Sequence, residues 1–185
     1  MNPPNTSREE IMRVSRKIVS EKGLPALNMR ALAKECGIAL GTLYNYYSDK
    51  DELVVAAIES VWQDILEKSA PDSGVRFSQY VMHIYARILS GLKDYPDFFA
   101  AHSISVAGSA KGKARGTMER CFGKIRGELH AALREDKNVD RSIFSETFRE
   151  EDLIEHILDT ITISIINGKP DCSVLMEILD RLLYR

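Results

Sequence analysis

The sequence predicts an all-α protein, in which a small N-terminal helix-turn-helix head precedes a larger helical body. Apolar residues recur at helical spacing through most of the chain. No segment shows the alternation of a β-strand or the turn of a β-hairpin. Glycine, proline and small polar residues separate the apolar segments, as they do at helix ends. We expect about nine helices, with the head formed by residues 1–50 and the body by residues 51–185.

The head is predicted to contain three helices. The first carries an apolar stripe from Ile11 to Val19, and the third is expected over residues 40–47. Side chains that cap free backbone groups, and glycines, mark the helix ends. The first helix is expected to begin near Ser7, with Thr6 and Glu9 as a capping box, and to end at Gly23. Asn28 is expected to cap the second helix, which Gly37 ends. Ser48 is expected to cap the fourth helix, with Asp51 in the reciprocal position.

The body is predicted to consist of further amphipathic helices and one longer loop. Residues 136–148 are polar and irregular, so we expect the loop there. The helices are expected over about residues 48–68, 77–95, 98–102, 114–134, 153–165 and 174–182.

The composition is that of a soluble globular protein, with 44% hydrophobic and 28% charged residues. No apolar run approaches the roughly 20 residues that cross a bilayer, and residues 1–7 lack the apolar core of an export signal. The three cysteines match no metal-binding or disulfide pattern. We therefore expect a cytoplasmic protein that contacts no membrane and uses no metal or other cofactor.

Charge is distributed unevenly along the chain. The net charge is −2, but residues 1–50 carry +3 and the remainder carries −5. A basic head on an acidic body is the arrangement expected if only the head contacts phosphate groups.

The segment 28–50, NMRALAKECGIALGTLYNYYSDK, carries most of the functional information. Its pattern predicts two short helices around a tight turn at Cys36-Gly37-Ile38, where glycine can adopt a left-handed conformation. The second helix is too short to be stable alone, so Leu43 and Tyr47 are expected to anchor it. Its other face would present hydroxyl groups to phosphates and apolar groups to thymine methyls.

This segment resembles the helix-turn-helix of the TetR family of bacterial regulators, and the resemblance covers about residues 8–55. The matching residues are Met29-Arg30-Ala31-Leu32-Ala33, Gly37-Ile38, Gly41-Thr42-Leu43-Tyr44-Asn45-Tyr46-Tyr47, Lys50 and Leu53. The resemblance implies binding to a double-stranded DNA operator. It implies phosphate contacts for Thr42, Tyr44, Tyr46 and Lys50, base contacts for Leu40, Gly41 and Asn45, and either kind for Arg30.

The start of this helix departs from the family pattern. Family members often have Ser-Lys before the glycine, whereas this chain has Ala39-Leu40. A capping hydroxyl and a basic side chain are therefore absent, which predicts fewer phosphate contacts at the start of the helix. Base recognition would then depend more on apolar contacts.

Each of these residues also has an ordinary structural explanation. Tyr44 and Tyr47 could both be core aromatics, Lys50 could be a solvated lysine, and Arg30 could pair with Glu35. The DNA-binding interpretation depends on the whole set, because spacing and capping agree across it.

Two aliphatic helices close the chain. The resemblance implies that they pack against the same helices of a second copy as a four-helix bundle. The wide apolar stripes at 153–165 and 174–183 favour this independently. We expect a homodimer through residues 150–185, with its recognition helices about 34–36 Å apart. The alternative is that both helices are buried within one chain.

The resemblance also implies a small-molecule ligand held among the helices of the body. Aromatic rings with histidines could line a largely apolar pocket, although most such residues are ordinary core at helical spacing. The candidates are Trp62, Tyr80, His83, Phe99, His102 and Phe122.

The sequence therefore predicts a sequence-specific DNA-binding transcriptional regulator. The resemblance implies a repressor that its ligand releases from the operator. One alternative is a TetR-like adaptor or coactivator that recruits a protein and binds little DNA. An enzyme is not expected, because the sequence shows no nucleophile–base pair, phosphate loop or metal site.

Overall fold

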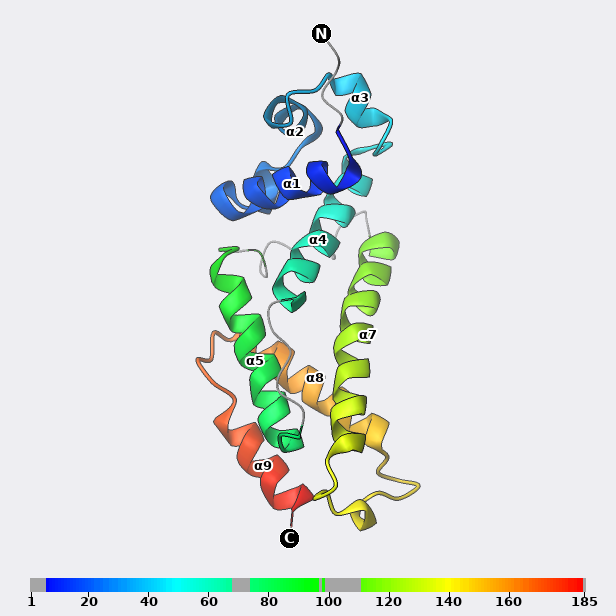
Figure 1. Cartoon of the computed structure of the whole chain (residues 1–185), viewed down its shortest axis with the longest axis vertical. Coiled ribbons are helices and arrows are strands. Elements are labelled where there is room, and N and C mark those ends of the chain that lie inside the picture. Colours follow the sequence, from blue (N-terminus) through cyan, green and yellow to red (C-terminus); the bar gives the residue numbers. More distant parts are fainter. Residues whose placement is uncertain (1–5, 68–73, 97, 99–110, 185) are drawn as a thin grey trace. The chain divides into compact units, whose positions relative to one another are not determined.

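The computed structural model describes residues 6–67, 74–96, 98 and 111–184, except the side chains of 67, 111–118 and 121 (Figure 1). In these ranges the elements are helical apart from one isolated bridge between Ser145 and Phe148, so the all-α prediction is confirmed. The α-helices are α1 (Arg8–Lys22), α2 (Met29–Glu35), α3 (Leu40–Tyr44), α4 (Lys50–Glu67), α5 (Phe77–Lys93), α7 (Lys111–Glu135), α8 (Glu150–Ile166) and α9 (Ser173–Leu183). None of these helices is both long and apolar enough to cross a membrane.

The chain folds as two compact units. One comprises Met1–Ile65 and Gly91–Glu119, and the other comprises Leu66–Ser90 and Arg120–Arg185. The head helices and most of α4 belong to the first unit, whereas α8 and α9 belong to the second. The division of the sequence into residues 1–50 and 51–185 stays a prediction.

Helix α1 begins where expected, but its cap is one residue later than predicted. The Ser7 hydroxyl, and not Thr6, accepts a hydrogen bond from the backbone N–H of Glu10 at 3.1 Å. Ser7 is the extended residue directly before the helix, so only its side chain can reach the first free N–H groups. The predicted apolar stripe is buried, and Gly23 ends the helix.

Helix α2 and the turn after it follow the prediction. The Asn28 side chain accepts from the N–H of Ala31 at 3.0 Å and caps the helix. Gly37 has φ +66°, the left-handed conformation that the turn was expected to need. The N–H of Ile38 then donates to the carbonyl of Ala33 at 3.0 Å, which closes the turn.

Helix α3 is shorter than predicted, because it ends at Tyr44 and not at Tyr47. After it the backbone tightens, and the N–H groups of Tyr46 and Tyr47 both donate to the carbonyl of Leu43. This turn directs the Tyr47 ring into the core, where the residue is 2% exposed. Ala39 offers no side-chain cap, as its departure from the family pattern predicts.

The cap of α4 also differs from the prediction by one residue. The Asp49 carboxylate, and not Ser48, accepts from the N–H of Glu52 at 2.7 Å. The reciprocal carboxylate is Glu52, and not Asp51, since Glu52 accepts from both the N–H and the hydroxyl of Ser48 at 2.8 Å. Apolar side chains that recur at helical spacing along α4 are buried: Leu53, Ala57, Val61 and Ile65.

Polar contacts join α1 to α4 and to the segment after α5 within the first unit. Arg16 donates to the Ser60 hydroxyl at 2.5 Å and lies 3.9 Å from the Asp64 carboxylate. The Tyr95 hydroxyl donates to Asp64 at 2.8 Å. Burial, followed by this hydrogen bond, raises the pKa of Tyr95, so the hydroxyl keeps its proton and remains a donor.

The second unit is built on α5 up to Ser90, on α7 from Arg120 onward, and on α8 and α9. The apolar positions predicted for α8 are all buried, and so are Ile125 and Leu129 of α7. The loop expected at 136–148 is confirmed, apart from the short helix Arg141–Ile143 and the isolated bridge.

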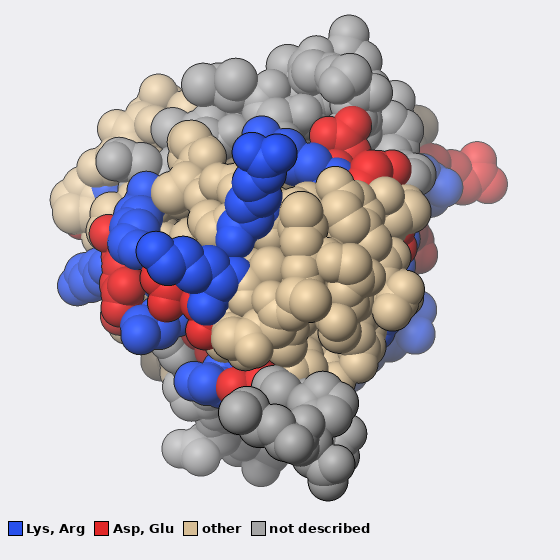
Figure 2. Space-filling model, turned by 90° about the horizontal axis from the view of Figure 1, so that it is seen from above, with Lys and Arg blue, Asp and Glu red and all other residues tan. Residues whose placement is uncertain are grey.

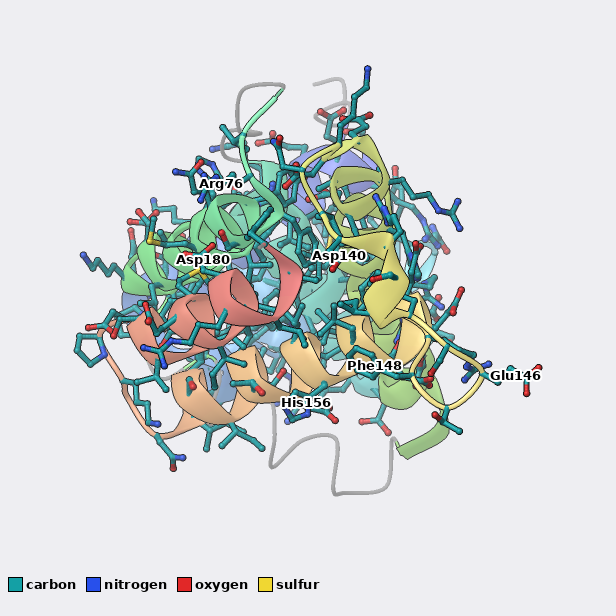
Figure 3. The ribbon with its side chains drawn as sticks, turned by 90° about the horizontal axis from the view of Figure 1, so that it is seen from below. Arg76, Asp140, Glu146, Phe148, His156 and Asp180 are labelled. Atoms are coloured by element: carbon teal, nitrogen blue, oxygen red, sulfur yellow. The ribbon has the colours of Figure 1, made fainter. Side chains whose placement is uncertain are left out.

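A buried carboxylate joins the ends of three helices in this unit. Asp136, which is 6% exposed, follows α7 and accepts from the N–H of Phe77 at 2.8 Å and from the hydroxyl of Tyr184 at 2.6 Å. Burial alone would raise the pKa of Asp136, but these bonds and those from Asn138 outweigh it and lower the pKa. Figure 3 shows this end of the unit, with Asp180 on α9.

The short helix expected through Phe98, Phe99 and His102 lies mostly outside the described residues. Phe98 is described and fully buried, with its ring edge toward Trp62 at a centroid distance of 6.1 Å.

Candidate nucleic-acid interface

Helix α3 is clamped on one side and open on the other. Leu43 is fully buried and Tyr47 is nearly so, which fixes the helix against the rest of the head. Burial raises the pKa of Tyr47, in keeping with its place in the core. Tyr44 and Asn45, which follow Leu43, are exposed, and Tyr44 is 49% exposed although it is a large aromatic residue. An exposed aromatic beside exposed hydroxyl and amide groups is suited to contact with a nucleic acid.

The predicted site residues fall into three groups. Gly41, Thr42, Tyr44 and Asn45 lie exposed together on α3 or directly after it. Leu40, at the start of the helix, is half-buried. Two basic residues stand on neighbouring elements and are exposed: Arg30 in the first turn of α2, and Lys50 at the first position of α4.

Packing within the chain does not explain why position 41 is a glycine. A Cβ atom built there would meet no other atom within 4 Å. Its φ angle is not in the left-handed region, so the backbone does not require glycine either. The absence of a side chain is explained if the surface of a partner approaches the helix closely at this point.

Several cations around α3 are free to neutralise phosphates. Glu35 pairs with Lys22 at 3.6 Å, and not with Arg30 as the alternative interpretation suggested. Within the part of the chain that the structure describes, Arg30, Lys34 and Lys50 form no ion pair. Figure 2 looks onto the end that carries α2 and α3 and shows Lys and Arg side chains gathered beside a broad uncharged surface.

Tyr46 is arranged differently from the other residues predicted to contact DNA. It is half-buried, and its hydroxyl donates to the backbone carbonyl of Thr6. Its own carbonyl accepts from the Arg8 guanidinium at 2.7 Å. Sequence reasoning missed Arg8 and Thr6, because these contacts join residues 38 and 40 positions apart and leave no local pattern.

The candidate ligand residues are only partly described. Tyr80 and His83 lie on α5 and Phe122 on α7, all half-buried and all in the second unit. Trp62 is buried in the first unit. Phe99 and His102 lie outside the described residues. Among the residues that are described, no group of three or more His, Cys, Asp or Glu side chains could hold a metal ion.

An apolar surface is exposed on α8 and α9. Leu175 and Leu179 face the interior, whereas Val174 is 73% exposed and Ile178 is 55% exposed. The alternative that both helices are buried within one chain is therefore wrong. We call this surface the α8–α9 face, and its exposed apolar residues are Ile163, Ile166, Val174, Ile178 and Leu182.

A groove of about 220 Å³ runs between the two helices on this face. Its wall includes Thr160 and Ser164 of α8 as well as Val174 and Ile178 of α9. His156, which also lines the groove, extends outward from α8 (Figure 3). The face is therefore both apolar and hollowed.

Comparison with known proteins places the similarity mainly in the N-terminal part. Residues 11–57 match the family model described as bacterial regulatory proteins, tetR family. An HTH-type transcriptional regulator of Haemophilus influenzae is 32% identical over 99 residues, which cover 47% of this chain and 53% of that protein. The HTH-type transcriptional regulator UidR of Escherichia coli is 32% identical over 77 residues, or 41% of this chain and 39% of that protein. The matched part thus spans about half or less of these relatives.

The fold extends the similarity to nearly the whole chain. The regulator PfmR of Thermus thermophilus, a TetR family member, has a TM-score of 0.54 at 18% identity and covers 96% of this chain and 95% of its own. A TetR-family transcriptional regulator from Haemophilus influenzae has a TM-score of 0.52 at 19% identity, with 96% of both chains covered. At this identity the likeness concerns the fold alone. It confirms the predicted arrangement of an N-terminal helix-turn-helix and a C-terminal helical domain.

Proposed function

We propose that this chain is a TetR-family transcriptional regulator that reads a DNA operator with α3, because residues 11–57 match the model of that family. One observation carries this proposal. The short helix is anchored by Leu43 and Tyr47, while Gly41, Thr42, Tyr44 and Asn45 are exposed on its open side. The relatives are named as transcriptional regulators, which supports a regulator and not an enzyme.

The exposed residues divide by their chemistry. Thr42 and Tyr44 donate hydroxyl protons to phosphate oxygens, and Lys50 neutralises phosphate from the start of α4. Leu40, Gly41 and Asn45 lie where base edges would be read, with Leu40 offering an apolar contact to a thymine methyl. Arg30 reaches either a phosphate or a base edge from the first turn of α2.

A selection experiment tests operator binding. Wild-type protein is incubated with random-sequence duplexes, bound duplexes are enriched, and the affinity of the best is measured over a range of salt concentrations. The logarithm of the affinity should fall linearly with the logarithm of salt concentration, by about 0.9 for each phosphate neutralised. Enrichment of no duplex would contradict the proposal and favour the alternative of a protein-recruiting adaptor or coactivator.

The α8–α9 face supports a homodimer. An apolar area of this kind is normally covered, and a two-fold axis would let each copy cover the other with the same residues. The dimer through residues 150–185 would set two α3 helices about 34–36 Å apart, the separation of successive major grooves on one side of the duplex. The selected operator should then be palindromic.

A small-molecule ligand is proposed to release the protein from its operator, which makes it a repressor acting in the cytoplasm. Tyr80, His83 and Phe122 are half-buried and can contribute to an apolar site in the second unit. Release would require the ligand to bind one dimer geometry better than the other. Helix α4 is suited to transmit the change, because Arg16 of α1 bonds directly to its Ser60.

Ligand release is testable without knowing the ligand in advance. Small molecules that raise the melting temperature are identified first, since binding to the native state stabilises it. Each is then added to the complex with the selected duplex, and operator affinity should fall at least about tenfold. A tight ligand that leaves operator affinity unchanged would refute this mechanism.

A further inference from the structure

Helix α3 needs support that its own sequence does not supply. It has only five residues, and Ala39 provides no side-chain cap. A helix of this length is unstable in isolation, because too few hydrogen bonds offset the order imposed on the backbone. Leu43 and Tyr47 hold its buried side. The segment that follows the helix carries Tyr46 and bonds back to the Leu43 carbonyl through the N–H groups of Tyr46 and Tyr47.

Two hydrogen bonds fasten that backbone to the start of α1. The Tyr46 hydroxyl donates to the carbonyl of Thr6, and the Arg8 guanidinium donates to the carbonyl of Tyr46 at 2.7 Å. The same guanidinium lies over the Tyr47 ring, 5.0 Å from its centroid, within the range of a cation–π contact. The two bonds run in opposite directions between the same two segments.

The start of α1 is itself a fixed point. Ser7 lies between Thr6 and Arg8, and its hydroxyl caps the helix through the N–H of Glu10. A capped first turn holds the backbone in one conformation. The contacts therefore tie the end of α3 to the capped first turn of α1 and to the residue just before its cap.

The hydrogen-bond chemistry of Tyr46 separates it from Tyr44. A tyrosine hydroxyl has one proton, and phosphate oxygens are acceptors only. The proton of Tyr46 is committed to the Thr6 carbonyl. Tyr46 cannot donate to a phosphate while this bond is kept, whereas Tyr44 is exposed on the open side of the helix.

We propose that Thr6, Arg8 and Tyr46 form an α1–α3 clasp that positions the recognition helix, and that Arg8 and Tyr46 are positioning residues and not DNA contacts. The inference rests on the proposed function, because the helix is held in place for operator binding. Loss of the clasp would leave the protein folded but would let the end of α3 move.

Hydrogen exchange in the free protein tests the clasp without DNA. Tyr46→Phe and Arg8→Met should each speed amide exchange at residues 46 and 47 by about three- to tenfold, the effect expected for losing one net hydrogen bond. Arg13→Met is the matched control, since Arg13 is on the same helix but bonds only to Glu10 of α1 in the described structure. Unchanged exchange in both clasp variants would overturn the proposal.

Operator affinity then distinguishes positioning from direct contact. On the duplex selected by wild-type protein, Arg8→Met and Tyr46→Phe should weaken binding about three- to tenfold per head. Arg8→Met should leave the dependence on salt unchanged, because no phosphate contact is removed. A decrease of the salt slope by about 0.9 per head would make Arg8 a phosphate contact and overturn its positioning role.

The two proposals fail in different ways. If the wild-type protein enriches no duplex, operator binding is refuted, while the exchange measurement still decides whether the clasp exists. If operator binding is normal and neither variant alters exchange or affinity, only the clasp is refuted. Circular dichroism at the assay temperature confirms that each variant remains folded.

Discussion

Replacing Tyr44 by alanine should abolish specific operator binding and leave the dimer intact. The side chain is 49% exposed, so its removal costs little packing within the chain. In the complex the change would remove both a hydroxyl contact and an aromatic surface from each head. A loss of about 1–3 kcal/mol at each of two heads lowers affinity between about thirtyfold and more than a thousandfold. Affinity for the selected duplex, measured by fluorescence anisotropy, checks this result.

The control for this variant is Tyr44→Phe, which keeps the ring and removes only the hydroxyl. It should have an intermediate affinity, and the comparison separates the phosphate contact from the apolar one. Light scattering should give the same mass for all three proteins. A Tyr44→Ala protein that binds the selected duplex normally would exclude Tyr44 from the interface.

Replacing Ile178 by glutamate should convert the proposed dimer to monomers and, as a consequence, remove most operator affinity. Ile178 is 55% exposed near the middle of α9 and lines the groove of the α8–α9 face. A two-fold axis would bury two unpaired carboxylates in an apolar interface, at a cost of several kcal/mol. The monomer would bind one half-site, with an affinity reduced at least about a hundredfold. Sedimentation over a range of protein concentrations measures the change of mass.

Met82→Glu provides the matched control for the dimer prediction. Met82 is also an exposed apolar residue, at 51%, and it lies on α5 in the same unit but outside the α8–α9 face. This variant should remain dimeric and should bind the selected duplex normally. Dissociation of both variants alike, or of neither, would contradict the assignment of the interface to α8 and α9.

Local sequence patterns were sufficient to predict the helices, most of their buried faces and the turn at Gly37. Caps were predicted less accurately, because neighbouring residues offered the same chemistry. Thr6 and Ser7 are both hydroxyl residues, and only the backbone conformation decides that Ser7 caps α1. At α4, Asp49 is the cap and not Ser48, which instead donates to Glu52.

The exposure of side chains on the candidate DNA-contacting surface was predictable from the sequence of α3 alone. The contacts between the end of α3 and the start of α1 were not. Exposure of Thr42 and Tyr44 follows from the burial of Leu43 and Tyr47, a relationship that helical spacing contains. The hydrogen bonds of Tyr46 join it to the distant residues Thr6 and Arg8. No periodicity in the sequence relates residues so far apart, so the pattern alone grouped Tyr46 with Tyr44.

The vacant surroundings of Gly41 bear on how such a regulator could acquire a new operator. Apart from its chain neighbours and the backbone of its own helix, nothing in the chain lies within 4 Å of the position that a first side-chain atom would occupy. A larger residue could be introduced there at little cost to folding, and its effect would be felt by the bound base pairs. If Gly41 faces base edges as proposed, substitutions at position 41 would change base preference with little effect on stability, which would make it a favourable place to redirect the protein to a different promoter.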